Sequence, residues 1–255
     1  MVALRIASAL ALAAAASARK MTVYNACPFT IWPAMYTPPD INSALPDHTT
    51  GWEAPAWSSV TFNVPDDWQS GRIWGRRNCD FSTNPGPNSC LTGGCNGGLV
   101  CDHYSGTGVP PATLAEWTMN GSGGLDNYDV SLVDGYNLPM RVSTNVGCPV
   151  AECPVDLGPN CPAANKGPFD SSGFPVGCKS DCQLASVPSN SPACCSGQWA
   201  GGPQDCPSSG AEPSYSYFKS NCPNAYGYAY DEPSGTALWT CPASKYAEYT
   251  VTFCP

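Results

Sequence analysis

The sequence is poor in charged residues, and basic residues are the scarcer kind. Only 12% of its 255 residues are charged, with 11 Lys and Arg against 20 Asp and Glu. Nucleic acids and anionic lipids are held mainly through their negative charges, so a chain with few basic side chains has little with which to bind them. This composition argues against a nucleic-acid or membrane-surface partner and leaves a neutral polymer, such as a polysaccharide, open.

Long hydrophobic runs are also absent, apart from one near the start. An apolar stretch from Ile6 to Ala16 follows Arg5 and ends in the small residues Ala16-Ser17-Ala18, which is the pattern of a secretory signal peptide. We expect residues 1–18 to be removed, leaving 10 basic and 20 acidic residues. No later segment approaches the roughly 20 apolar residues of a membrane span. The sequence therefore predicts a protein that is secreted, extracellular or associated with the cell wall.

The chain lacks a C-x-x-C pair and has only two histidines, His48 and His103, although it contains 16 cysteines. Zinc sites need clustered cysteine or histidine ligands, so zinc is the weaker interpretation. An even number of cysteines in a secreted chain favours eight disulfides, each worth about 2–4 kcal/mol. We expect no metal and no cofactor.

Gly and Pro make up about a fifth of the chain, so turns should outnumber long helices. No tandem repeat, charge run or long linker divides it. Short β-branched and aromatic runs between turn residues indicate strands. The expected strands are residues 21–24, 29–32, 59–64, 71–75, 128–132 and 249–253. Between Cys148 and Cys222 the sequence holds nine cysteines and little periodicity, which predicts a loop-rich lobe.

Several motifs resemble those of the thaumatin-like proteins, and the resemblance covers the whole mature chain. They are GRIWGRRNC at 71–79, CLTGGC at 90–95 followed by Cys101, DVSLVDGYNLPM at 129–140 and the ending VTFCP at 251–255. Gly94 departs from the pattern, which usually has an acidic residue there. A longer, tryptophan-rich segment at 37–57 makes the chain more similar to fungal β-1,3-glucanases of this family.

The resemblance implies an all-β fold: a flattened β-sandwich with disulfide-rich lobes and an acidic cleft. It assigns residues 19–77, 114–152 and 223–255 to the sandwich, 78–113 to a small disulfide lobe and 153–222 to a large one. It also implies the disulfide pairing. The pairs are Cys27–Cys254, Cys79–Cys90, Cys95–Cys101, Cys148–Cys241, Cys153–Cys222, Cys161–Cys178, Cys182–Cys194 and Cys195–Cys206.

The same resemblance implies a set of cleft residues, and the residues implied are Arg72, Glu116, Asp129, Asp134 and Asp231. Hydrolysis of a glycosidic bond uses one protonated carboxyl group and one carboxylate that acts as nucleophile or base. We expect Glu116 to be the general acid and Asp134 the nucleophile or base. Arg72, Asp129 and Asp231 would bind the substrate and support the charges.

One spacing tests this arrangement. Side chains alternate between the two faces of a strand, and an odd number of residues separates Asp129 from Asp134, so an unbroken strand would point them apart. The Asp134-Gly135 turn signal can redirect the second carboxylate. Aromatic rings beside these acids are candidates for stacking on sugar rings. These are Trp117, Tyr128, Tyr226, Tyr228 and Tyr230.

The sequence therefore favours a monomeric, secreted endo-β-1,3-glucan hydrolase that acts on fungal cell-wall glucan. A non-catalytic glucan-binding antifungal protein is the main alternative, and inhibition of a foreign hydrolase is another. Some of the five cleft residues would then serve only as a salt-bridge network. The triplet Asn120-Gly121-Ser122 is an N-glycosylation sequon in a turn-rich stretch.

Overall fold

The computed structural model describes residues 18–42 and 44–255. The predicted signal peptide therefore lies outside the described residues except for Ala18, with which the first strand begins. No helix among the described residues is long and apolar enough to cross a membrane. The strands are β1 (Ala18–Asn25), β2 (Trp32–Tyr36), β3 (Ser59–Pro65), β4 (Gly71–Cys79), β5 (Cys90–Thr92), β6 (Leu114–Gly121), β7 (Leu125–Ser131), β8 (Met140–Thr144), β9 (Ala151–Cys153), β10 (Trp239–Pro242) and β11 (Tyr249–Phe253).

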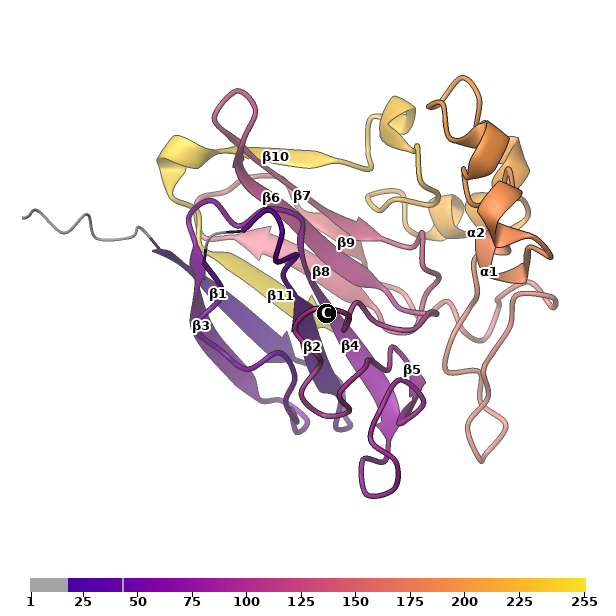
Figure 1. Ribbon diagram of the computed structural model, residues 1–255, viewed down its shortest axis with the longest axis horizontal. Coiled ribbons are helices and arrows are strands. Elements are labelled where there is room, and N and C mark those ends of the chain that lie inside the picture. Colours follow the sequence, from indigo (N-terminus) through magenta and orange to yellow (C-terminus); the bar gives the residue numbers. More distant parts are fainter. Residues whose placement is uncertain (1–17, 43) are drawn as a thin grey trace, which may run out of the picture.

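The strands form two sheets, which confirms the predicted sandwich (Figure 1). The first sheet has the order β3-β1-β11-β8-β9, and the second has the order β10-β7-β6-β4-β2, with β5 attached to β4. The two terminal strands, β1 and β11, pair in parallel at the centre of the first sheet, where Val23 lies opposite Val251. The first and last strands are thereby built into the same sheet.

Most expected strands are present, but the second one was misplaced. Residues 29–32 were expected to be a strand, whereas β2 begins only at Trp32. Phe29 lies in a bend and is 39% exposed, and Ile31 makes a single bridge to Ala54. The aromatic and β-branched run therefore belongs mostly to the turn that leads into the strand.

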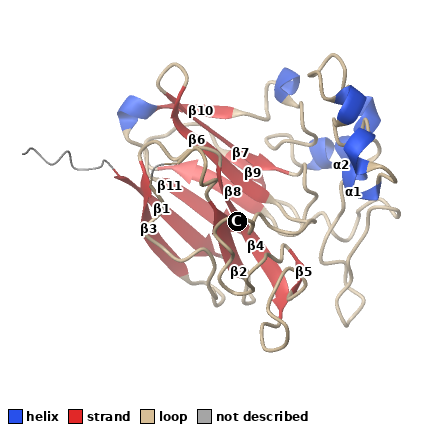
Figure 2. Ribbon diagram, in the orientation of Figure 1, coloured by secondary structure: helices blue, strands red, loops and turns tan. Residues whose placement is uncertain are grey.

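Both α-helices and three of the five 3-10 turns lie in the disulfide-rich segment at one end of the sandwich (Figure 2). The two α-helices are α1 (Asp181–Leu184) and α2 (Ser214–Asn221), and α2 buries Phe218 against the main core. The 3-10 turns are η1 (Pro188–Asn190), η2 (Gly197–Trp199), η3 (Ser208–Ala211), η4 (Glu232–Ser234) and η5 (Ala243–Lys245).

Large aromatic side chains fill the space between the sheets. Trp117 of the second sheet stacks on Trp68 at 5.8 Å and meets the edge of Tyr249 from the first sheet at 6.0 Å. All three are at most 1% exposed. Burying side chains of this size contributes about 1.5–3 kcal/mol each, so this aromatic group holds the two sheets together.

All eight disulfides implied by the resemblance are present, and none of the sixteen cysteines, all of which lie in the described chain, is free. Cys27–Cys254 spans 227 residues and joins the segments that follow β1 and β11. Cys148–Cys241 ties β10 to the loop after β8. Cross-links over such long loops strongly restrict the unfolded chain.

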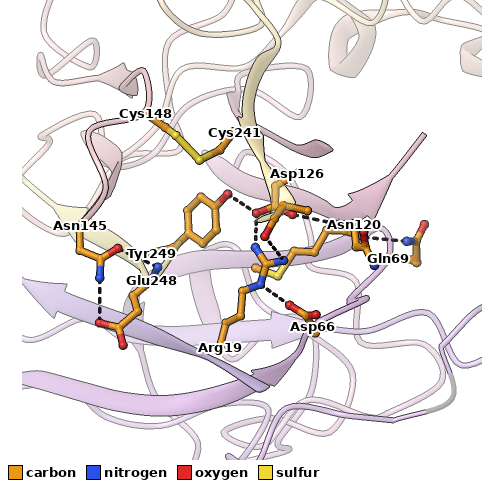
Figure 3. Close-up of polar contacts among 12 residues, drawn as sticks. Arg19, Asp66, Gln69, Asn120, Asp126, Asn145, Cys148, Cys241, Glu248 and Tyr249 are labelled. Atoms are coloured by element: carbon orange, nitrogen blue, oxygen red, sulfur yellow. Dashed lines mark hydrogen bonds and ion pairs between the residues drawn. A yellow bond between two sulfur atoms is a disulfide. The ribbon is translucent and has the colours of Figure 1, made fainter. Parts of the chain in front are cut away.

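A buried ion pair fastens the start of β1 to the second sheet (Figure 3). The guanidinium of Arg19 contacts the carboxylates of Asp126 and Asp66. Asp126 is fully buried, and it also accepts hydrogen bonds from the Tyr249 hydroxyl and the Asn120 backbone N–H, both at 2.9 Å. Its charge is therefore paired and hydrogen-bonded, as a buried charge must be.

Candidate functional site

A cavity of about 450 Å³ opens on the second sheet. Its floor comes from β4, β6 and β7. One wall comes from residues 226–238, which begin beside the end of β7 and lead into β10, the strand that pairs with β7. Four carboxylates line it, those of Glu116, Asp129, Asp134 and Glu232. The other lining residues are Ser70, Arg72, Leu114, Trp117, Thr118, Asn127, Ser131, Val133, Tyr226, Ala229 and Leu238.

Strand register places three of the predicted residues in one row across the floor. Arg72 of β4 lies opposite Glu116 of β6, and Glu116 lies opposite Asp129 of β7. Their chain neighbours Ala115 and Val130 are fully buried on the other face. The alternation of the pleated sheet thus sends the apolar side chains to the core and the charged row into the cavity.

The fourth predicted residue, Asp134, reaches the same cavity from a turn beyond the end of β7. Gly135 has a φ of +77°, and its N–H donates to the Leu132 carbonyl at 2.9 Å. A side chain at position 135 would also meet the Cys178 carbonyl at 2.8 Å, so glycine is required there. This turn reverses the chain and brings Asp134 to the side of the sheet that Asp129 faces, despite their odd spacing.

The structure does not bring Asp231 into this group. Its side chain is 1% exposed and forms an ion pair with Lys219 of α2 at 2.9 Å. It also accepts hydrogen bonds from the Tyr215 hydroxyl at 3.1 Å and from the Gly227 N–H at 2.9 Å. Asp231 is therefore absent from the cavity lining, and it anchors the wall to the disulfide-rich segment.

Glu232, which the sequence did not single out, takes the fourth acidic position. It is the first residue of η4, it is exposed, and it lines the cavity. The sequence offers one signal for it, two consecutive acids before Pro233. That signal does not say which acid faces inward, because the choice depends on a contact with Lys219, which lies in a different element, α2.

The electrostatic environment favours protonated carboxyl groups in the cavity. Burial raises the pKa of Glu116, and Asp134 adds to this, while Arg72, whose Nη2 lies 3.5 Å from Glu116 Oε1, opposes it. Burial and the neighbouring Glu116 raise the pKa of Asp129 well above its ordinary value. Burial also raises the pKa of Asp134, again opposed by Arg72. Carboxyl groups of this kind can supply a proton under mildly acidic conditions.

Two polar atoms of the charged row have no hydrogen-bond partner within the described chain. These are Arg72 Nε and Asp129 Oδ1, both of which are buried. Buried polar groups are normally hydrogen-bonded, so unpartnered ones in a cavity mark positions that a ligand could satisfy. Among residues 18–42 and 44–255, no three His, Cys, Asp or Glu side chains are grouped as a metal site.

Of the aromatic residues that were candidates for stacking on sugar, Tyr226 lies in the cavity wall but is only 9% exposed. Trp117 also borders the cavity, but Trp117 and Tyr128 are at most 1% exposed and belong to the core. Tyr228 packs edge-on against Tyr215 at 5.0 Å, and the Tyr230 hydroxyl donates to the Ala200 carbonyl. Four of the five rings therefore serve packing between strands or lobes.

Comparison with known proteins places the chain in a family. The thaumatin family matches residues 25–255. Thaumatin-like protein 1 of Arabidopsis thaliana is 41% identical over 248 residues, covering 92% of this chain and 85% of the relative. The pathogenesis-related thaumatin-like protein 3.5 of Cryptomeria japonica is 41% identical over 244 residues, covering 94% and 91%.

A solved structure shares the fold at much lower identity. It is a laminaripentaose-producing β-1,3-glucanase in complex with laminaritetraose, with a TM-score of 0.56 and 12% identity. The similarity covers 93% of this chain and 99% of the glucanase. The fold, the eight disulfides and the match over nearly the whole described chain agree, and the chain belongs to the thaumatin family.

Proposed function

We propose that the protein is a secreted endo-β-1,3-glucan hydrolase that acts on cell-wall glucan in the acidic cavity. The observation that supports this most directly is the row of Arg72, Glu116 and Asp129, joined by Asp134 from the adjacent turn. It brings together carboxyl groups that could act as the proton donor and as the nucleophile or base of glycoside hydrolysis, and it places Arg72 beside them.

The catalytic roles follow from position and charge. Glu116 is the general acid, because burial keeps its carboxyl group protonated to a higher pH than usual. Asp134 is the nucleophile or base, and Arg72 counters the effect of burial on the pKa of Asp134, as it also does for Glu116. Asp129 and Arg72 have unpartnered buried atoms that would bind sugar hydroxyls.

The net charge of −9 and the acidic lining favour a neutral polysaccharide over an anionic one, since like charges repel in a cleft. The structural relative that shares the fold produces laminaripentaose and binds laminaritetraose, which is consistent with a β-1,3-glucan substrate. Secretion rests on the predicted signal peptide and on the disulfides, which persist in oxidising surroundings.

The test is release of reducing sugar from a soluble linear β-1,3-glucan by wild type, Glu116→Gln and Glu53→Gln. Glu53 is an exposed glutamate away from the cavity lining and serves as a matched control. We expect release by wild type and Glu53→Gln, and a loss of at least a hundredfold in Glu116→Gln, as is typical when a general acid is removed.

The alternative is a glucan-binding defence protein without turnover. The similarity to a pathogenesis-related thaumatin-like protein favours it. Sedimentation with insoluble β-1,3-glucan separates the two functions, because a binder would pellet with the polymer. If all three proteins pellet equally and none releases sugar, the protein is a binder and the assigned catalytic roles are wrong.

A further inference from the structure

A second cavity, of about 530 Å³, lies away from the acidic one, and the proposed function does not use it. It is bounded by the loop before β3, by the end of β3 and by the end of β6. Apolar surface comes from Ala44, Leu45 and Pro65, and Asp47 and Asp67 supply carboxylates. We call this surface the Leu45 groove.

The remaining residue of interest in the Leu45 groove is Asn120, the first residue of the sequon. Asn120 is exposed near the end of β6, where the pairing with β7 is irregular, and its φ is +49°. Its backbone N–H donates to Asp126 Oδ1 at 2.9 Å, so the buried ion pair of Arg19 fixes the backbone at this position. Figure 3 shows Asn120 beside Asp126.

The side chains of the sequon are available for modification. Ser122 is exposed in the turn between β6 and β7, and the following Gly123 and Gly124 have open space around them. Within the described chain, no hydrogen bond engages the Asn120 amide or the Ser122 hydroxyl, and the Asn120 contact to Asp126 is made by the backbone. An enzyme that must reach both side chains would therefore find them free before and after folding.

We propose that Asn120 carries an N-linked glycan and that its first N-acetylglucosamine residues lie in the Leu45 groove. The amide Nδ2 of Asn120 forms a bond to C1 of the first sugar and loses one proton. The bond between C1 and the diphosphate of a lipid-linked oligosaccharide donor breaks, and the lipid diphosphate leaves. This modification needs no oxidant or reductant and requires that the chain enters the secretory pathway, as its predicted signal peptide implies.

The chemistry of the Leu45 groove suits this occupant. Acetyl groups and sugar-ring faces are apolar and can cover Leu45 and Pro65, whereas hydroxyl and amide N–H groups can donate to carboxylates. Asp67 is exposed and makes no hydrogen bond within the described chain, and Asp47 is held in place by the Asn63 N–H at 2.6 Å. The volume falls in the range of small-ligand sites.

The first experiment measures intact mass after secretion of the full chain from yeast. We expect wild type and Ser122→Thr to carry one oligosaccharide and Ser122→Ala to carry none, because the sequon needs a hydroxyl residue at its third position. Absence of any sugar on both wild type and Ser122→Thr overturns the proposal.

The second experiment asks where the sugar lies. We expect slower amide hydrogen exchange in residues 44–48 and 61–67 of the glycosylated protein than of Ser122→Ala, and a melting temperature about 2–4 °C higher. Leu45→Ser, which changes a side chain that is 47% exposed, should abolish both differences without unfolding the protein. A glycosylated protein with the exchange and melting temperature of Ser122→Ala would show that the sugar extends into solvent, and the Leu45 groove would be excluded.

Discussion

Replacing Asp231 should lower the stability of the protein with little effect on glucan binding. Replacing the adjacent Glu232 should weaken glucan binding with little effect on stability. Asp231→Asn removes the charge that pairs with Lys219, in a place where the aspartate side chain is 1% exposed and the lysine side chain 16% exposed. Breaking a buried ion pair typically costs 3–5 kcal/mol. Because Lys219 is partly exposed and can turn toward water, we expect the lower end, about 3 kcal/mol.

That cost corresponds to a fall of about 6–12 °C in melting temperature for a chain of this size. Glu232→Gln alters an exposed side chain and should change the free energy of unfolding by less than about 0.5 kcal/mol. If Glu232 contacts the glucan, its loss removes a charge-assisted hydrogen bond worth about 1.5–3 kcal/mol, which weakens binding by roughly tenfold or more.

The assays are scanning calorimetry of both variants and titration calorimetry with a β-1,3-linked gluco-oligosaccharide. Asp231→Asn, measured below its melting transition, should bind nearly as well as wild type, since Asp231 does not line the cavity. The reasoning is refuted if Asp231→Asn melts like wild type and loses binding while Glu232→Gln keeps it. In that case Asp231 would act in the cavity and the ion pair with Lys219 would be unimportant.

Two further predictions concern buried carboxyl groups. Burial raises the pKa of Asp129, so the folded protein holds the proton of this carboxyl group more tightly than the unfolded chain does. The stability that this proton contributes is complete below about pH 4, the ordinary pKa of aspartate, and it is lost as the pH rises through the raised pKa. Asp129→Asn should therefore be more stable than wild type at pH 7, with the difference vanishing near pH 3 in urea titrations. Asp126→Asn leaves Arg19 with Asp66 alone and should cost about 3–5 kcal/mol, measured by the same titrations, whereas an effect below 1 kcal/mol would mean that Asp66 suffices.

Much of the fold could be predicted because its signals are local. The β-branched runs at 21–24, 59–64 and 249–253 lie inside β1, β3 and β11, and the cysteine order, taken with the family resemblance, gave the disulfides. Strand β6 was missed for a physical reason. Its sequence LAEWTMNG is rich in residues that favour helices, and only pairing with β4 and β7 makes it a strand.

The parts of the candidate site that depend on side-chain alternation along a strand and on turn residues could be predicted from the sequence. Alternation along β7 faces Asp129 away from the core, and the Asp134-Gly135 turn accounts for the second carboxylate. The orientation of Asp231 and Glu232 could not be predicted, because it depends on Lys219 of α2. A contact between two different elements has no signature in the local pattern of either one.

The acidic cavity carries a cost that the rest of the fold must offset. The pKa values of Glu116, Asp129 and Asp134 are all raised. Each of these groups therefore lowers the stability of the folded protein as the pH rises above the ordinary pKa of a carboxyl group. Such a site requires a frame that resists local opening. The Lys219–Asp231 pair holds the middle of the wall formed by residues 226–238, and Cys148–Cys241 holds the strand that follows it. If these carboxyl groups have only a structural role, neutral substitutions in the cavity would improve stability without loss of function. If they serve proton transfer, the same substitutions would stabilise the protein and abolish turnover, as expected when a site is maintained against stability.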